Sequence, residues 1–438
     1  MKKSKNVTNT LFIQRRSILI LLIAISFCLQ AFAQNKLVYN HFSTEDGLAT
    51  SDVKCVAQDK QGFIWVATSS GLQKFDGNRF INPLENKGSS KALSIGVRQI
   101  IADSNGRFFL FMMNNEYALF DPMSLEFKYI RIKSLKEVPI KADYQLYKDS
   151  KGHIFMCANN YGLLMYDSKR NLYTDQNLPI QIPPSWTVNG LYEDVKSGNY
   201  WICSDTGLAV YNIVSRKLFY KGHNPEHIPL VDGNYRAMAF LIDKENRYWL
   251  THWTLEKNYE EHVLYYDANT KRIVNRPNGS NLGDYAQVRS LMEDYNGTIW
   301  LGGFEVLLTL YPRQNNFIQN KDTGSGTNGI KFSIINSLFQ DREKNIWVSS
   351  DKGLFIVYPK GSSISNFQFT QKNDIYVVSF SAEKENEIWV AAWGKGILFF
   401  DSTLNELKNN TGSLPKFIMW LYADKKTNIV WASYADGT

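Results

Sequence analysis

One stretch decides the fold of this chain: Asp59-Lys60-Gln61-Gly62-Phe63-Ile64-Trp65-Val66-Ala67-Thr68-Ser69-Ser70-Gly71-Leu72. An aspartate opens a short turn, a glycine supplies a positive φ, and an apolar strand follows that carries a tryptophan six residues after the aspartate. Variants of this phrase recur along the chain, each with an aromatic residue in the tryptophan position. These nine aromatic anchors are Trp65, Phe109, Phe155, Trp201, Trp249, Trp300, Trp347, Trp389 and Trp431.

The spacing of the anchors indicates a propeller. Successive anchors lie 42 to 51 residues apart, which is the length of a four-stranded blade. One such sheet cannot bury both of its apolar faces, so we expect blades to stack around an axis and each anchor to pack against the next blade. The sequence therefore predicts an all-β protein, with a β-propeller of about seven four-stranded blades followed by the incomplete start of a second propeller.

Three segments are expected. Residues 1–33 combine basic residues, an apolar run and an Ala31-Phe32-Ala33 ending, which is typical of a signal peptide. Residues 34–363 are assigned to the seven-bladed propeller, with the strand from Leu37 to Phe42 completing its last blade. Residues 364–438 are assigned to the first blades of a second propeller. Since the chain ends at Thr438 within a blade, we expect a truncated product.

Charge and cysteine content exclude several classes of function. The formal charge of +7 includes five basic residues of the predicted signal peptide, which leaves +2 for the rest. That charge gives no support to a nucleic-acid partner. Cys55, Cys157 and Cys203 form no CxxC pair, so neither a disulfide framework nor a zinc site is indicated. We expect no metal and no cofactor.

The first blade resembles a known family. The motif begins at His41-Phe42-Ser43-Thr44-Glu45-Asp46-Gly47-Leu48, and continues through the stretch quoted above to Phe75-Asp76-Gly77 and Phe80. It resembles the opening of the two-component regulator propeller proteins of Bacteroidetes, and the resemblance covers residues 37–438.

The resemblance implies a sensor. In that family exported propellers precede a membrane helix and a histidine kinase, so this chain would be a periplasmic ligand-sensing module whose kinase output is absent. The membrane link would come only through missing C-terminal parts. The family's ligands are described as glycans, which implies an oligosaccharide that regulates its own utilisation. The propeller could also pair with a second copy as a homodimer.

Candidate ligand residues come from positions where the blades differ, because ligand residues must differ between blades while packing residues need not. One set lies five residues before each repeat aspartate, on the strand expected nearest the axis; the other follows the second strand. The first set contains basic residues, and with Arg236 nearby it suits an anionic sugar such as a uronate. The candidates are Lys54, Arg98, Tyr144, Arg236, Arg289, Trp253 and Trp393.

Three readings remain open at this stage. Polar residues in these positions can simply line a water-filled channel, and tryptophans there can merely cover a blade edge. The chain could instead be a free-standing propeller used for protein–protein interaction. A propeller glycosidase or lyase is the less favoured alternative, because the aspartates recur once per blade at a turn, whereas a catalytic pair of carboxylates would break the repeat.

Overall fold

The structure, a computed structural model, describes most of the chain from residue 37 onward. The described ranges are 37–83, 95–133, 144–158, 161–183, 185–254, 263–280, 282, 287–322, 329–358, 377–384, 387–394, 396–401, 406–407, 416–424, 427 and 429–435. The chain divides into two compact units, Met1–Gly361 and Ser362–Thr438. The predicted signal peptide and the predicted boundary at residue 363 both lie outside the described residues.

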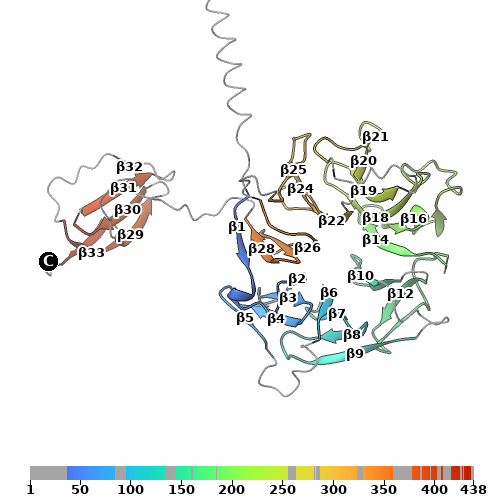
Figure 1. The fold of residues 1–438 in the computed structure, drawn as a ribbon, viewed down its shortest axis with the longest axis horizontal. Coiled ribbons are helices and arrows are strands. Elements are labelled where there is room, and N and C mark those ends of the chain that lie inside the picture. The colour runs from blue at the N-terminus through green and yellow to red at the C-terminus, as the bar shows by residue number, and fades with distance from the viewer. Residues whose placement is uncertain are drawn as a thin grey trace, which may run out of the picture. The chain divides into compact units, whose positions relative to one another are not determined.

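The first unit is a ring of seven four-stranded antiparallel blades (Figure 1). Blades 1 to 3 are β2 (Val53–Gln58), β3 (Ile64–Thr68), β4 (Gly71–Phe75), β5 (Phe80–Ile81); β6 (Val97–Ala102), β7 (Phe108–Met112), β8 (Tyr117–Phe120), β9 (Phe127–Ile132); and β10 (Tyr144–Lys148), β11 (Ile154–Ala158), β12 (Gly162–Asp167), β13 (Leu172–Thr174). Blades 4 and 5 are β14 (Val188–Asp194), β15 (Asn199–Ser204), β16 (Gly207–Asn212), β17 (Lys217–Phe219); and β18 (Tyr235–Ile242), β19 (Arg247–Thr254), β20 (Val263–Asp267), β21 (Arg272–Asn275). Blade 6 is β22 (Gln287–Glu293), β23 (Ile299–Phe304), β24 (Val306–Leu310), β25 (Ile318–Gln319).

Blade 7 closes the ring with strands from both ends of the unit. Its order is β1 (Tyr39–Phe42), β28 (Gly353–Val357), β27 (Ile346–Ser350) and β26 (Ile335–Gln340), and β1 pairs antiparallel with β28 from Tyr39 opposite Val357 to Phe42 opposite Leu354. The prediction that an N-terminal strand completes the last blade is therefore confirmed. A short 3-10 helix, η1 (Thr44–Asp46), then leads into blade 1.

Blades 2 and 3 are also joined at their outer edge. Strands β9 and β13 pair in parallel, so the two blades form one eight-stranded sheet. Pairing the outer strands removes two exposed sheet edges, which are otherwise sites of unwanted association.

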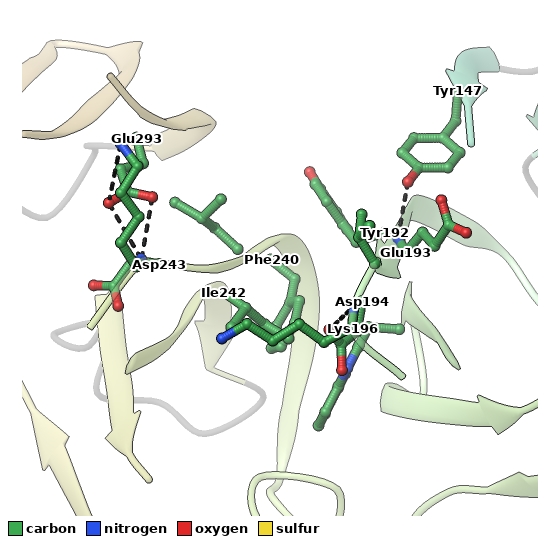
Figure 2. Close-up of a pocket in the computed structure, with 13 residues that line it drawn as sticks. Tyr147, Tyr192, Glu193, Asp194, Lys196, Phe240, Ile242, Asp243 and Glu293 are labelled. Atoms are coloured by element: carbon green, nitrogen blue, oxygen red, sulfur yellow. Dashed lines mark hydrogen bonds and ion pairs between the residues drawn. The ribbon is translucent and has the colours of Figure 1, made fainter. Parts of the chain in front are cut away.

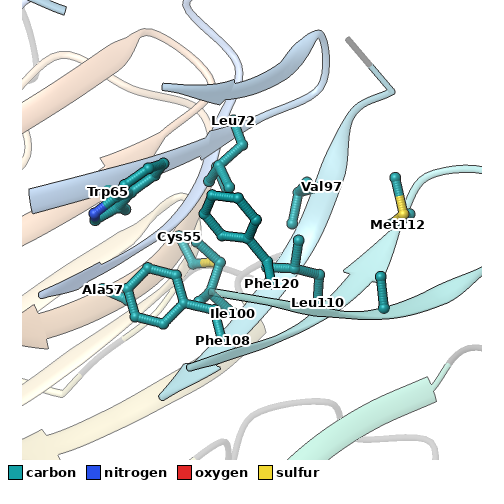
Figure 3. Packing of buried hydrophobic residues seen from close by; sticks show 12 residues of the cluster. Cys55, Ala57, Trp65, Leu72, Val97, Ile100, Phe108, Leu110, Met112 and Phe120 are labelled. Carbon is teal, nitrogen blue, oxygen red and sulfur yellow. The ribbon is translucent and has the colours of Figure 1, made fainter. Parts of the chain in front are cut away.

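The anchors of the first unit pack between neighbouring blades, as predicted. Trp65 of blade 1 meets Phe108 and Phe120 of blade 2 edge-on, with ring centroids 5.9 and 5.1 Å apart (Figure 3). Trp201 stacks on Phe240 of blade 5 at 4.5 Å. Each of the seven junctions has its own apolar cluster containing one anchor, so the core runs around the ring as a series of inter-blade layers.

The second unit contains the last two anchors. It is built from β29 (Val377–Lys384), β30 (Glu387–Ala392), β31 (Gly396–Asp401) and β32 (Glu406–Leu407), followed by β33 (Ile418–Asp424) and β34 (Ile429–Tyr434). Trp389 packs against a cluster that includes Leu421 of the following hairpin. Trp431, in contrast, is 61% exposed, because no strand in the described part of the chain covers its face, so the packing expected of every anchor is not found there.

Candidate functional site

The repeat aspartates are bound into their turns. Asp59 accepts hydrogen bonds from the backbone N–H of Gln61 and Phe63 through Oδ1, and its Oδ2 accepts the indole N–H of Trp65 at 2.8 Å. Asp243, Asp294 and Asp341 bind the tryptophans of their own blades in the same way, at 2.8, 3.0 and 2.8 Å. These carboxylates therefore connect the turn to the anchor. This agrees with the prediction that the repeated aspartates have a structural role and not a catalytic one.

Two blades that lack the tryptophan use other donors. Asp103 accepts from the side chain of Arg107. Asp149 accepts from the hydroxyl of Tyr200, which belongs to the next blade, and lies 2.7 Å from Nδ1 of His153. The buried carboxylate thus finds a partner even where the anchor is a phenylalanine, as a desolvated charge requires.

A β-bulge marks the first candidate set. In blades 1, 2, 4, 5, 6 and 7 the pairing of the first two strands shifts register at the residue five before the repeat aspartate. A bulge leaves the extra residue out of the ladder and re-aims its side chain. The bulged residues are Lys54, Arg98, Asn189, Met238, Arg289 and Asn336, all near the start of the innermost strands. We call this end of the ring the loop end.

Two of the bulged residues brace the ring. The side-chain amide of Asn189 donates to the carbonyl of Ala237 at 2.8 Å, and that of Asn336 donates to the carbonyl of Val53 at 2.7 Å. Each bond crosses to the next blade. These asparagines hold neighbouring inner strands together and are not free for a ligand.

The three cationic bulge residues have weaker or local partners. Lys54 pairs with Asp52 at 2.8 Å, and Arg98 donates to the carbonyl of Met113 at 3.4 Å while lying over the ring of Phe111. Arg289 is exposed and donates to the side chain of Gln287 at 2.9 Å. The backbone of Tyr144 pairs with Ala158, but its side chain lies outside what the structure describes.

The side chains of Arg236 and Trp253 lie next to each other at the loop end. They are directly opposite each other in the ladder of β18 and β19, and the guanidinium carbon lies 5.4 Å from the indole ring centroid. The Nε atom of Arg236 is buried and has no hydrogen-bond partner in the described part of the molecule. This N–H is a buried donor that is left unsatisfied.

The remaining candidate, Trp393, belongs to the second unit. Its side chain is 40% exposed and packs against Phe417, with ring centroids 5.2 Å apart. The structure thus brings Arg236 and Trp253 together and places Lys54, Arg98 and Arg289 in equivalent positions of the same ring, whereas Trp393 belongs to the other unit.

The opposite end of the ring, where the repeat turns lie, carries a latch between blades that sequence reasoning missed. The residue before the repeat aspartate accepts the backbone N–H of the residue after the previous blade's aspartate. The four latches are Ser150 to Glu193, Lys244 to Glu293, Tyr295 to Gln340 and Arg342 to Gln58. The last one reinforces the seam closed by β1.

A pocket of about 270 Å³ opens at this turn end, beside blades 4 and 5 (Figure 2). It is lined by Tyr147, Tyr192, Glu193, Asp194, Val195, Lys196, Trp201, Phe240, Leu241, Ile242, Asp243, Lys244 and Glu293. Burial raises the pKa of Tyr147 to about 12 and also raises the pKa of Glu293. These groups lie in partly dehydrated surroundings.

The cysteines of the propeller are part of its core. Cys55, Cys157 and Cys203 are all buried free thiols. Burial raises the pKa of the first two to about 12, and raises that of Cys203 as well. Thiolates, which react and bind metals, are therefore suppressed.

The described residues also limit other chemistries. They contain no group of three or more histidine, cysteine or acidic side chains that could hold a metal ion. Nor do they include a helix of the length and hydropathy needed to cross a bilayer.

Comparison with solved structures identifies similar folds. The extracellular domains of the Bacteroides thetaiotaomicron hybrid two component systems BT3049 and BT4673 match with TM-scores of 0.55 and 0.54, at 17% and 16% identity. Each comparison covers 91% of this chain, and 52% and 51% of those domains, so the chain spans about half their length. Virginiamycin B lyase from Staphylococcus aureus matches at a TM-score of 0.50 and 10% identity, over 74% of this chain and 98% of the lyase. At these identities the likeness concerns the fold alone.

Sequence comparison points to the first blade. A histidine kinase P4 from Formosa agariphila is 49% identical over 49 residues, which is 11% of this chain and 4% of the kinase. The family model described as two component regulator propeller matches residues 47–70, which include the aspartate turn and the first anchor. The first blade of the seven-bladed ring therefore carries a repeat of the two component regulator propeller family.

Proposed function

We propose that this chain is the ligand-sensing propeller of an exported two-component receptor, and that its ligand is an oligosaccharide with acidic groups. The two component regulator propeller repeat in the first blade supports a sensor role, and the signal-peptide pattern of residues 1–33 supports a periplasmic location. The observation that carries the ligand class is the set of cations at the loop end of the ring.

The geometry at the loop end suits an anionic sugar. Bulges take the backbone of Lys54, Arg98 and Arg289 out of the strand ladder and re-aim their cationic side chains. Arg236 adds a guanidinium with a buried, unpaired Nε above an indole ring. Arginine binds carboxylates through paired N–H donors, and an aromatic face packs against the C–H face of a sugar.

An enzymatic role has less support. The repeat aspartates that a glycosidase would need are engaged by turn N–H groups and indole N–H groups. We therefore expect binding without turnover, which a reducing-end assay on the bound oligosaccharide would measure.

The test is a binding titration with oligogalacturonate as the acidic probe and cellooligosaccharide of equal length as the neutral one. We expect the double variant Arg98→Ala/Arg289→Ala to weaken oligogalacturonate binding by about tenfold or more. The reason is that the loss of charge-assisted hydrogen bonds to the sugar carboxylates is enough to lower affinity by this factor. Arg79→Ala/Arg170→Ala is the matched control, because both arginines are exposed and pair with turn aspartates elsewhere on the ring. Unchanged binding by the first variant, with its thermal transition intact, would overturn the loop-end site.

A further inference from the structure

The turn-end pocket lies where the repeat is broken. At four junctions a glutamine or glutamate side chain latches one blade to the turn of the previous blade. Blades 2, 3 and 5 have Ala102, Lys148 and Ile242 in that position, whose side chains cannot accept a hydrogen bond. At the junction with blade 5, unlike the other two, the preceding turn is also longer by one residue, since Trp201 follows Asp194 by seven positions instead of six. The pocket occupies the place of the missing latch.

The walls of this pocket are mostly apolar. The rings of Tyr192, Trp201 and Phe240 and the side chains of Leu241 and Ile242 contribute to its lining. A latch residue would be expected to fill this space with a polar amide or carboxylate. An apolar hollow with this lining suits the hydrocarbon body of a small molecule.

The rim of the pocket carries acidic groups from two strands. Glu193 and Asp194 end β14, and Glu293 ends β22 (Figure 2). Glu193 accepts from the backbone and the hydroxyl of Ser150, and each carboxylate oxygen retains capacity for a further bond. Asp243 also lines the pocket, but its carboxylate is committed to the turn and to Trp249.

The two lysines of the rim are engaged elsewhere. Lys196 donates to the side chain of Asn246 at 3.0 Å, and Lys244 donates to the carbonyls of Asp294 and Tyr295. Lys244 lies 3.9 Å from Glu293, and burial raises the pKa of that carboxyl group. Its two oxygens accept from the backbone N–H of Lys244 and keep lone pairs for a further donor.

We propose that the turn-end pocket is a second binding site of this propeller, for a small organic amine with an apolar body. The protonated amine pairs with the rim carboxylate of Glu293, and the apolar body enters the space left by the missing latch. The site lies at the other end of the ring from the cationic loop end and takes ligand of opposite charge. It does not depend on the proposed oligosaccharide function.

The test uses calorimetric titration of the full chain with three probes of one shape. These are 2-phenylethylamine, the neutral 2-phenylethanol and the anionic 3-phenylpropionate. We expect saturable binding of the amine, with the alcohol weaker by about tenfold or more, since a charge-assisted hydrogen bond is lost. Equal binding of amine and alcohol, or no saturable binding of the amine, would overturn the proposal.

Two variants locate the site. Ile242→Gln restores the residue type found in the latches of Gln58 and Gln340, so we expect it to close the pocket and weaken amine binding by about tenfold. Glu293→Gln keeps an acceptor for the N–H of Lys244 while removing the charge, and should weaken binding whether or not the first variant folds well. Glu245→Gln is the control, because this exposed glutamate lies on blade 5 outside the pocket lining. Wild-type affinity in both Ile242→Gln and Glu293→Gln would refute this location.

Discussion

The hydrogen bond between aspartate and tryptophan within a blade predicts a measurable loss of stability when the carboxylate is removed. Asp294 is 1% exposed and accepts from the N–H groups of Asn296 and Thr298 and from the indole of Trp300, at 2.8, 2.9 and 3.0 Å. Hydrogen bonds to a charged group contribute roughly 1.5–3 kcal/mol each, although losses within one network are not additive. We therefore expect Asp294→Ala to lower the free energy of unfolding by about 4 kcal/mol.

A double-mutant cycle separates the indole bond from the turn bonds. Asp294→Asn can keep its oxygen toward the turn but presents an amide N–H₂ to the indole N–H of Trp300, so it should cost about 2 kcal/mol. In Trp300→Phe the same Asp294→Asn change should cost less, which gives a coupling energy of about 1 kcal/mol. The measurement is urea unfolding followed by intrinsic fluorescence.

The control is another turn aspartate of the same ring. Asp267 caps an exposed turn through the N–H groups of Asn269 and Thr270 but has no indole partner in the structure as described. We expect Asp267→Ala to cost about 1 kcal/mol. If Asp294→Ala costs no more than this control, or if the coupling with Trp300 is zero, the assignment of the repeat aspartate as a buried brace is refuted.

Three further predictions follow from individual contacts. Asn336→Ala removes the bond to the carbonyl of Val53 across the closing seam, and should lower the free energy of unfolding by about 1–2 kcal/mol in urea denaturation; an unchanged midpoint would contradict the bracing role. Burial raises the pKa of Glu293 above its usual 4.5, so the folded state favours the protonated form and loses that contribution as pH rises through the raised pKa. The midpoint temperature of Glu293→Gln minus that of wild type should therefore rise between pH 4 and pH 7 in scanning calorimetry. A fall in this difference would show the sign to be wrong. Cys157 and Cys203 should resist a thiol reagent at pH 8 in the folded protein and react after denaturation, whereas rapid native labelling would contradict their burial.

The fold could be predicted from sequence because its stabilising contacts repeat. Each anchor of the first unit packs against the next blade, and this requirement places one aromatic residue every 42 to 51 positions. The closing strand could be inferred as well, because blade 7 lacks an outer strand of its own and the segment from Leu37 precedes the first complete blade. The anchor at Trp431 shows the limit of this reasoning, since the pattern specifies a packing face but not what covers it.

The candidate site could be predicted only in part. The cationic positions stood out because Lys54, Arg98 and Arg289 occupy a slot that differs between blades. This position forms a β-bulge in six blades, but the six bulged residues share no residue type. The bulge therefore could not be predicted from the sequence. Asn189 and Asn336 show the consequence, since equivalent positions in one slot serve to brace blades and not to bind.

The latch was hidden for a different physical reason. Its acceptor and its donor lie on successive blades, more than 40 residues apart, and the donor is a backbone N–H that any residue supplies. Only the acceptor is visible in the sequence, as glutamine or glutamate before the repeat aspartate. Ala102, Lys148 and Ile242 occupy this position in the three blades without a latch. Of these three junctions, the one at Ile242 is also preceded by the longer turn between Asp194 and Trp201. In a repeat protein, two departures that meet at one junction are stronger grounds for a ligand site than a single unusual residue, because each alone can be absorbed by local packing. The turn-end pocket meets that condition.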